Sequence, residues 1–164
     1  EELSRLEFHF TGVAENQIKS ILNSDEYEKI KNNVILHNWM KYENLISLYQ
    51  NMHFLLLARD TNQMTLSNFP SKVPEVMTYG IVPVVSRVGD YTKYYLKDGV
   101  NSVIFEGCDA NSCARAIRRA ISFSEEEYIE ISSKARECVE RQFDYHNWTK
   151  KIKQAIESMY SENE

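Results

Sequence analysis

A lysine and a glutamate three residues apart carry the clearest chemical signal in this sequence. Lys72 and Glu75 follow Pro70 and Ser71, which predicts that they lie one turn apart at the start of a short helix with Ser71 as its N-cap. A lysine in the first turn opposes the helix dipole, which favours an anion there. Lys72 and the free amides of Ser71 and Val73 would therefore bind phosphate, and Glu75 would accept hydrogen bonds from sugar hydroxyls. The pattern predicts a site for a nucleoside diphosphate.

Each of these residues also has an ordinary structural interpretation. Lys72 and Glu75 could be solvated side chains on a helix surface, and composition alone favours that view. Arg59 either forms a surface ion pair with Asp60 or neutralises the charge that develops on a departing diphosphate. Three polar residues of the same loop are further candidates for sugar contacts: Thr65, Ser67 and Asn68.

Short apolar strands that alternate with amphipathic helices would position these residues. The runs 53–58 and 82–85 are apolar along their length, which is typical of strands covered on both faces. We expect strands at 6–11, 33–36, 53–58, 82–85 and 102–105, a short helix between Ser71 and Gly80, and helices at 16–22, 41–50, 89–96, 111–123, 125–143 and 145–160, with 25–31 helical or looped.

This alternation predicts an α/β fold, a Rossmann-like parallel sheet with helices on both faces, as one domain over residues 1–164. In such sheets ligands bind beyond the carboxyl ends of the strands. The loops after Thr11, Leu36, Ala58 and Val85 are therefore the places to look for the site.

Composition narrows the class of protein. The chain has 164 residues, 43% of them hydrophobic, which is enough for a proper core. Its net charge of −5 argues against a nucleic-acid partner, since such proteins need a basic face. Three cysteines, an odd number with no CxxC pair, suggest reduced thiols in the cytoplasm. The sequence opens on Glu1 without a methionine, and we expect it to be part of a longer protein.

Two segments resemble the group 1 (family 4) retaining glycosyltransferases of the GT-B fold. In the segment 70–85, the string Pro-Ser-Lys-x-x-Glu-x-Met-x-x-Gly-x-x-Pro-Val-Val is similar to the nucleotide-sugar-binding segment of that family. The segment 98–105 is similar to the family's DGVNGLLF turn and strand. The resemblance covers the whole chain as the carboxy-terminal, donor-binding half. It implies that the last helix, about 145–160, crosses toward an amino-terminal acceptor domain absent here.

The resemblance implies a hexosyltransferase whose donor is a nucleoside diphosphate sugar. The acceptor would be a glycan or a lipid-linked sugar, as in polysaccharide biosynthesis, and neither a metal nor a cofactor is expected. Arg59, Lys72 and Glu75 would be the catalytic residues, with Glu75 on the ribose hydroxyls. Six residues would bind the donor: Gly12, Asn68, Ser71, Lys72, Val73 and Glu75.

The resemblance also bears on partners and location. It implies that this domain alone is inactive without the amino-terminal half, which would hold the acceptor. The expected location is cytoplasmic, and the resemblance leaves peripheral association of the full-length protein with the inner face of the membrane open.

Two alternatives remain. Ser67 stands where the family often has a first glutamate, and the loop after Gly12 lacks the arginine and lysine that often follow it. Both departures favour a non-catalytic nucleotide-binding module with a degenerate glycosyltransferase fold. A flavodoxin-like regulatory domain would need an acidic cluster at the strand ends, where Asp60 stands alone. The histidines have no cysteine, aspartate or histidine partners at ligand spacing, which argues against a metal site.

Overall fold

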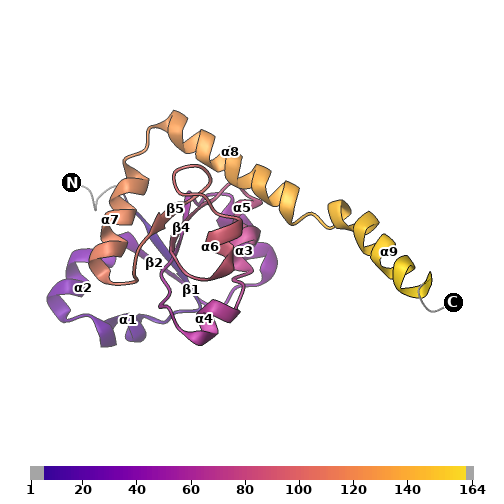
Figure 1. The fold of residues 1–164 in the computed structure, drawn as a ribbon. Helices are drawn as coiled ribbons and strands as arrows, with labels where there is room; N and C mark the ends of the chain where they lie inside the picture. Colours follow the sequence, from indigo (N-terminus) through magenta and orange to yellow (C-terminus); the bar gives the residue numbers. More distant parts are fainter. Residues whose placement is uncertain (1–5, 162–164) are drawn as a thin grey trace. The chain divides into compact units, whose positions relative to one another are not determined.

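The computed structural model describes residues 6–161 (Figure 1). The chain forms two compact units. The first unit runs up to Leu48 and the second begins at Tyr49. The expectation of one domain over residues 1–164 stays a prediction.

The first unit is a two-stranded parallel sheet with short helices. Strands β1 and β2 pair in register from Phe8 with Val34 to Thr11 with His37. Its elements are β1 (Phe8–Thr11), α1 (Glu15–Ile21), α2 (Ser24–Ile30), the 3-10 turn η2 (Lys31–Asn33), β2 (Val34–His37) and α3 (Tyr42–Tyr49), whose last residue belongs to the second unit. Segment 25–31, which the sequence left open, is helical.

The second unit is a three-stranded parallel sheet in the order β3-β4-β5. Its elements are β3 (Phe54–Leu57), α4 (Gln63–Ser67), α5 (Lys72–Met77), β4 (Val82–Ser86), α6 (Gly89–Tyr94), β5 (Val103–Phe105), α7 (Ala110–Ile121), α8 (Glu125–Gln142) and α9 (His146–Ser161). Every strand and every long helix expected from the sequence is present within about two residues at each end.

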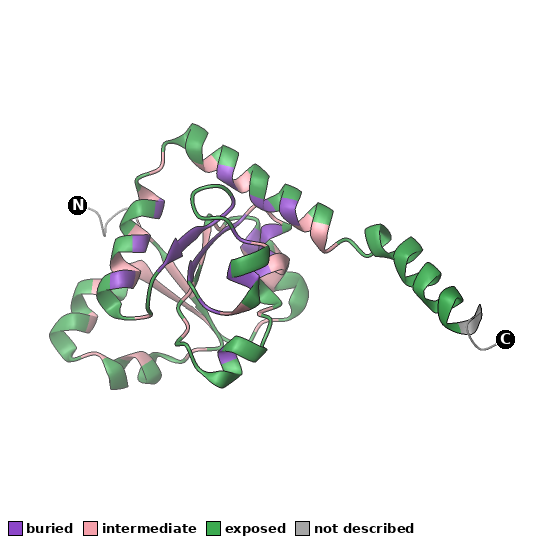
Figure 2. Ribbon diagram, viewed as in Figure 1, coloured by how far each residue is buried: buried purple, intermediate pink, exposed green. Residues whose placement is uncertain are grey.

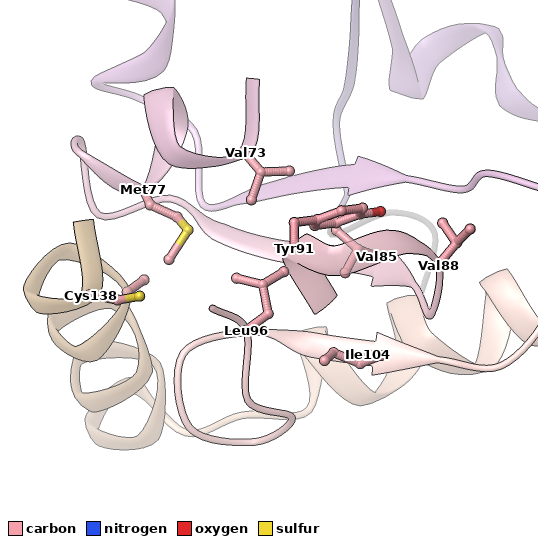
Figure 3. Packing of buried hydrophobic residues seen from close by; sticks show 9 residues of the cluster. Val73, Met77, Val85, Val88, Tyr91, Leu96, Ile104 and Cys138 are labelled. Atoms are coloured by element: carbon pink, nitrogen blue, oxygen red, sulfur yellow. The ribbon is translucent and has the colours of Figure 1, made fainter. Parts of the chain in front are cut away.

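Helices cover both faces of this sheet. Neighbouring residues of β4 point to opposite faces, so they contact different helices. Val85 joins a cluster with residues of α5, α6 and α8, which include Met77, Tyr91 and Cys138 (Figure 3). Val84 joins a separate cluster with Ala116 and Ala120 of α7. All five residues of β4 are buried (Figure 2). The Rossmann-like fold with helices on both faces is therefore confirmed.

Pro83 lies inside β4, although proline cannot donate a hydrogen bond to a sheet. The Val82 amide donates to His53 O on the β3 side, so the nitrogen of Pro83 faces the opposite side. Pairing with β5 begins only at Val84, opposite Val103. The proline therefore interrupts no hydrogen bond between these strands.

Two expectations about local structure were wrong. We expected the run 53–58 to be covered on both faces, but Leu56 is exposed. We expected a polar loop between Arg59 and Phe69, but α4 forms there, with Asn62 as its N-cap.

Candidate functional site

The loop that leads into α5 is held in place by aromatic packing. The Phe69 ring contacts the rings of Tyr91, Tyr95 and Phe143, with centroid separations of 6.3, 5.8 and 5.6 Å. These partners come from α6, its C-cap and the C-cap of α8. Phe69 therefore fixes the start of α5 relative to two other helices of the unit.

Lys72 and Glu75 lie on one side of α5, where they meet Tyr49 from the end of α3. The Lys72 Nζ atom is 3.4 Å from Glu75 Oε2 and donates to the Tyr49 hydroxyl at 2.9 Å. The Tyr49 hydroxyl in turn donates to Glu75 Oε1 at 3.5 Å. The side chains of Lys72 and Glu75 are 46% and 26% exposed, so both remain open to a ligand.

The electrostatics of this cluster favour a charged lysine. Burial disfavours the ammonium, but the hydrogen bond to Tyr49 and the Glu75 carboxylate outweigh it and raise the pKa of Lys72. Burial raises the pKa of Tyr49, and the Lys72 ammonium beside it works in the opposite direction. At neutral pH the cluster therefore presents a cation and a neutral phenol beside a glutamate side chain.

Arg59 lies just after β3, and Ser86 at the end of β4 holds its backbone. The Ser86 hydroxyl accepts from the Arg59 amide at 2.7 Å and donates to the Arg59 carbonyl at 2.9 Å. The guanidinium donates to Asn68 Oδ1 at 3.3 Å through Nη2. Its Nη1 atom is buried. Burial raises the pKa of Tyr91, and the Arg59 guanidinium beside the Tyr91 hydroxyl works in the opposite direction, so these two side chains interact.

Arg59 and Asp60 have different partners, contrary to the surface ion pair that we considered. Arg59 binds Asn68, whereas Asp60 accepts a hydrogen bond from the Cys108 thiol. That hydrogen bond raises the pKa of Cys108. Thr65 of α4 closes the same loop, because its hydroxyl donates to Asp60 O at 2.5 Å.

Ser71 does not cap α5, and this prediction was wrong. Its backbone is already helical, with φ −55° and ψ −24°, and its side chain makes no capping hydrogen bond. Since an N-cap needs an extended backbone to turn its side chain onto the following amides, Ser71 cannot perform that role here. The Val73 amide, expected to face a phosphate, donates to Pro70 O at 3.0 Å. One of the two amides assigned to the phosphate is therefore already paired within the turn.

Gly12 ends β1 in the first unit. Its φ of +71° lies in the left-handed region, and its amide donates to His37 O at 2.9 Å. A Cβ added there would meet nothing within 4 Å, so space is left beside the backbone. In the same unit His9 Nδ1 is 2.9 Å from His37 Nε2, a pairing that the sequence spacing did not indicate.

Tyr49, Ser86 and Tyr91 are residues of the site that our sequence reasoning missed. Tyr49 is the last residue of α3 and lies near the end of the helix predicted over 41–50. Its hydroxyl was a usable signal, because a buried tyrosine usually needs a hydrogen-bond partner. Tyr91 is 1% exposed, and its hydroxyl lies beside the Arg59 guanidinium. Nothing in the local sequence marks Ser86.

Residues 6–161 contain neither a candidate metal centre nor a candidate membrane span. No group of three or more histidine, cysteine, aspartate or glutamate residues in that range is arranged to hold a metal ion. No helix there is long and apolar enough to cross a membrane.

A comparison with protein families identifies the class of the chain. The model of the family described as "Glycosyl transferases group 1" matches residues 2–138. The chain belongs to this family. A search of curated proteins finds no significant match.

Solved structures give the fold of this group 1 glycosyltransferase domain. It superposes on sucrose-phosphate synthase from Thermosynechococcus elongatus with a TM-score of 0.72 at 17% identity, covering 93% of this chain and 38% of that one. Anabaena HepE in complex with UDP gives 0.74 at 15% identity, covering 94% and 41%. HepE has also been solved in complex with UDP-glucose.

A third structure shows which half of the fold is present. The carboxy-terminal domain of LpcC, a group 1 family protein from Francisella tularensis, gives a TM-score of 0.62 at 13% identity, covering 79% of this chain and 63% of that one. The chain spans about two fifths of the length of the synthase and of HepE. Its fold is that of the carboxy-terminal domain of GT-B glycosyltransferases.

Proposed function

We propose that this chain is the donor-binding domain of a retaining glycosyltransferase. The complete enzyme would transfer a hexose from a nucleoside diphosphate to a glycan or lipid-linked acceptor in the cytoplasm, as in polysaccharide biosynthesis. The observation that carries the proposal is the juxtaposition of Lys72 and Glu75 at 3.4 Å, both partly exposed, in a member of the group 1 family. The complexes of HepE with UDP and UDP-glucose support the same class of donor.

The residues suggest how the donor would be held and activated. Lys72 would bind the diphosphate, and Glu75 would accept hydrogen bonds from the ribose hydroxyls. The Arg59 guanidinium would stabilise the charge that develops on the diphosphate as the glycosidic bond breaks. Because cations of the protein perform this role, the proposed mechanism assigns no step to a metal.

One observation favours a second candidate, a nucleotide-binding module without transferase activity. Ser67 ends α4, at the position where a carboxylate for the donor sugar was expected. A serine there lacks the carboxylate that could accept a charged hydrogen bond from the sugar. A transfer assay on the full-length protein separates the two candidates, because the module would bind the nucleotide sugar and release it intact.

Calorimetric titration with UDP, GDP and ADP, alone and as sugar conjugates, tests the donor site. We expect one diphosphate to bind, and Glu75→Ala to weaken it about tenfold or more, since a charged hydrogen bond contributes roughly 1.5–3 kcal/mol. Glu126→Ala, which removes an exposed glutamate of α8, is the matched control and should leave affinity unchanged. Failure of all three diphosphates to bind a folded chain would contradict the proposal.

A further inference from the structure

Tyr49 is the least exposed member of the cluster at α5. It is 7% exposed, whereas the Lys72 and Glu75 side chains are 46% and 26% exposed. Its ring packs against Tyr79 with centroids 5.6 Å apart, and the Lys72 Nζ atom lies 5.6 Å from its centroid. A buried ring held by packing has few alternative positions, so its hydroxyl is a fixed point beside two longer, more mobile side chains.

A phenol can serve both neighbours at once. Its oxygen accepts the hydrogen bond from the Lys72 ammonium, while its proton is donated to Glu75. The direct ion pair between Lys72 and Glu75, at 3.4 Å, closes the triangle. A diphosphate bound to the lysine and a ribose bound to the glutamate would compete with that ion pair. The contacts to Tyr49 involve different lone pairs and protons, so they can persist beside the ligand.

We propose that Tyr49 is a positioning residue of the donor site, whose hydroxyl keeps Lys72 and Glu75 at the separation that a nucleoside diphosphate spans when their mutual ion pair gives way to the ligand. The inference rests on the proposed function for the identity of the ligand. The contacts of Tyr49 with Lys72 and Glu75 are present in the structure without any ligand. Tyr49 itself touches neither the reacting atoms nor the ligand in this scheme.

Tyr49→Phe is the test, because it keeps the ring, its packing on Tyr79 and its contact with the Lys72 ammonium while it removes both hydrogen bonds. Tyr79→Phe is the matched control, since it removes a hydroxyl from the adjacent ring and leaves the triangle intact. Thermal unfolding of both variants shows that each is folded before the site is measured.

The first measurement needs no ligand. The pKa of Lys72 is followed by NMR of the lysine Cε, with Lys72→Gln to assign the signal. We expect Tyr49→Phe to lower the pKa of Lys72, because it removes a hydrogen bond that favours the ammonium, and Tyr79→Phe to leave it unchanged. An unchanged pKa in a folded Tyr49→Phe variant would overturn the inference.

The second measurement compares the diphosphate that binds in the titrations above with its parent nucleoside. Tyr49→Phe should weaken the diphosphate about fivefold to tenfold, the effect of one net hydrogen bond, and weaken the nucleoside less because it does not reach Lys72. An equal loss for both ligands would indicate a merely structural role and contradict the proposal.

The two measurements also separate this inference from the proposed function. If no diphosphate binds the unmodified chain, the proposed function and the ligand part of the inference both fail. The pKa of Lys72 then still decides whether Tyr49 holds the lysine. If the diphosphate binds and Tyr49→Phe has no effect on its affinity, the proposed function survives and the inference does not.

Discussion

At the scale of single residues, the site depends on side chains that hold the backbone as well as on those that face a ligand. Ser86 is 1% exposed, and its hydroxyl serves the amide and the carbonyl of Arg59 together. Such a bridge joins the ends of β3 and β4, the two strands from which the site loops extend. It also sets the direction in which the Arg59 side chain leaves the sheet.

Ser86→Ala should therefore destabilise the protein. The variant leaves two backbone groups of Arg59 without their partner, which costs about 1–3 kcal/mol when such groups are buried. We expect a lower midpoint in thermal unfolding and weaker binding of the nucleoside diphosphate, through loss of the Arg59 position. Ser122→Ala, which removes an exposed hydroxyl bonded to Arg119 O, is the control. Equal stability of the two variants would contradict the expected role.

The sequence indicated only part of this residue-level arrangement. The spacing of Lys72 and Glu75 was enough to predict one helical face, because the helical repeat brings residues three apart together. Tyr49 could not be found in this way, since it belongs to α3 and meets Lys72 only through tertiary packing. The Arg59 partner was mistaken for the same reason: the neighbour in sequence, Asp60, is not the neighbour in space.

At the scale of elements, the turn between α5 and β4 is specified by Gly80. The glycine has φ +76°, a left-handed conformation that ends the helix. An added Cβ would meet Ser132 Oγ of α8 at 2.7 Å. The Ser132 hydroxyl also donates to Gly80 O at 2.5 Å, so α8 is fastened to the turn. This turn sets where β4 begins relative to α5.

Gly80→Ala should lower the free energy of unfolding by about 2 kcal/mol or more. Roughly half would come from the left-handed backbone and the rest from the clash with Ser132. Chemical denaturation of Gly80→Ala, Ser132→Ala and the double variant measures the two parts. In the Ser132→Ala background the cost of Gly80→Ala should fall to about 1 kcal/mol. Strict additivity would show that the contact carries no energy.

Elements were predicted more reliably than their ends and caps. The start of α8 is specified locally, because both hydrogen bonds of its capping box involve only Ser124 and Glu127. Helix α4 was missed because its five residues show no apolar periodicity. Its N-cap at Asn62 was the signal available. The N-cap prediction for Ser71 failed for another reason. The packing of Phe69 on Phe143, which is distant in sequence, fixes the backbone that leads into α5.

At the scale of the whole molecule, the two units differ in how completely they bury their residues. The described residues of the first unit are intermediate or exposed, with none fully buried. The second unit contains a completely buried strand and clusters on both of its faces. Among the described residues, the second unit therefore buries more apolar surface than the first.

Hydrogen exchange should reveal this difference. We expect amides of β1 and β2 to exchange faster than those of β4, because local opening costs less where little apolar surface is buried. Mass spectrometry of peptic peptides that cover β1, β2 and β4 provides the measurement. Equal protection of all three strands would indicate one cooperative unit and support the single domain that the sequence predicted.

The alternation of Val84 and Val85 also constrains how this protein can vary through evolution. Each valine packs against a different set of helices. A change in the volume of one valine can therefore be compensated only by substitutions on its own side of the sheet. A larger residue at 84 would press on α7, where Ala116 and Ala120 are already small and have little volume to give up. A larger residue at 85 would require changes in α5 or α8. Compensatory substitutions on one face of β4 should therefore arise independently of those on the other face.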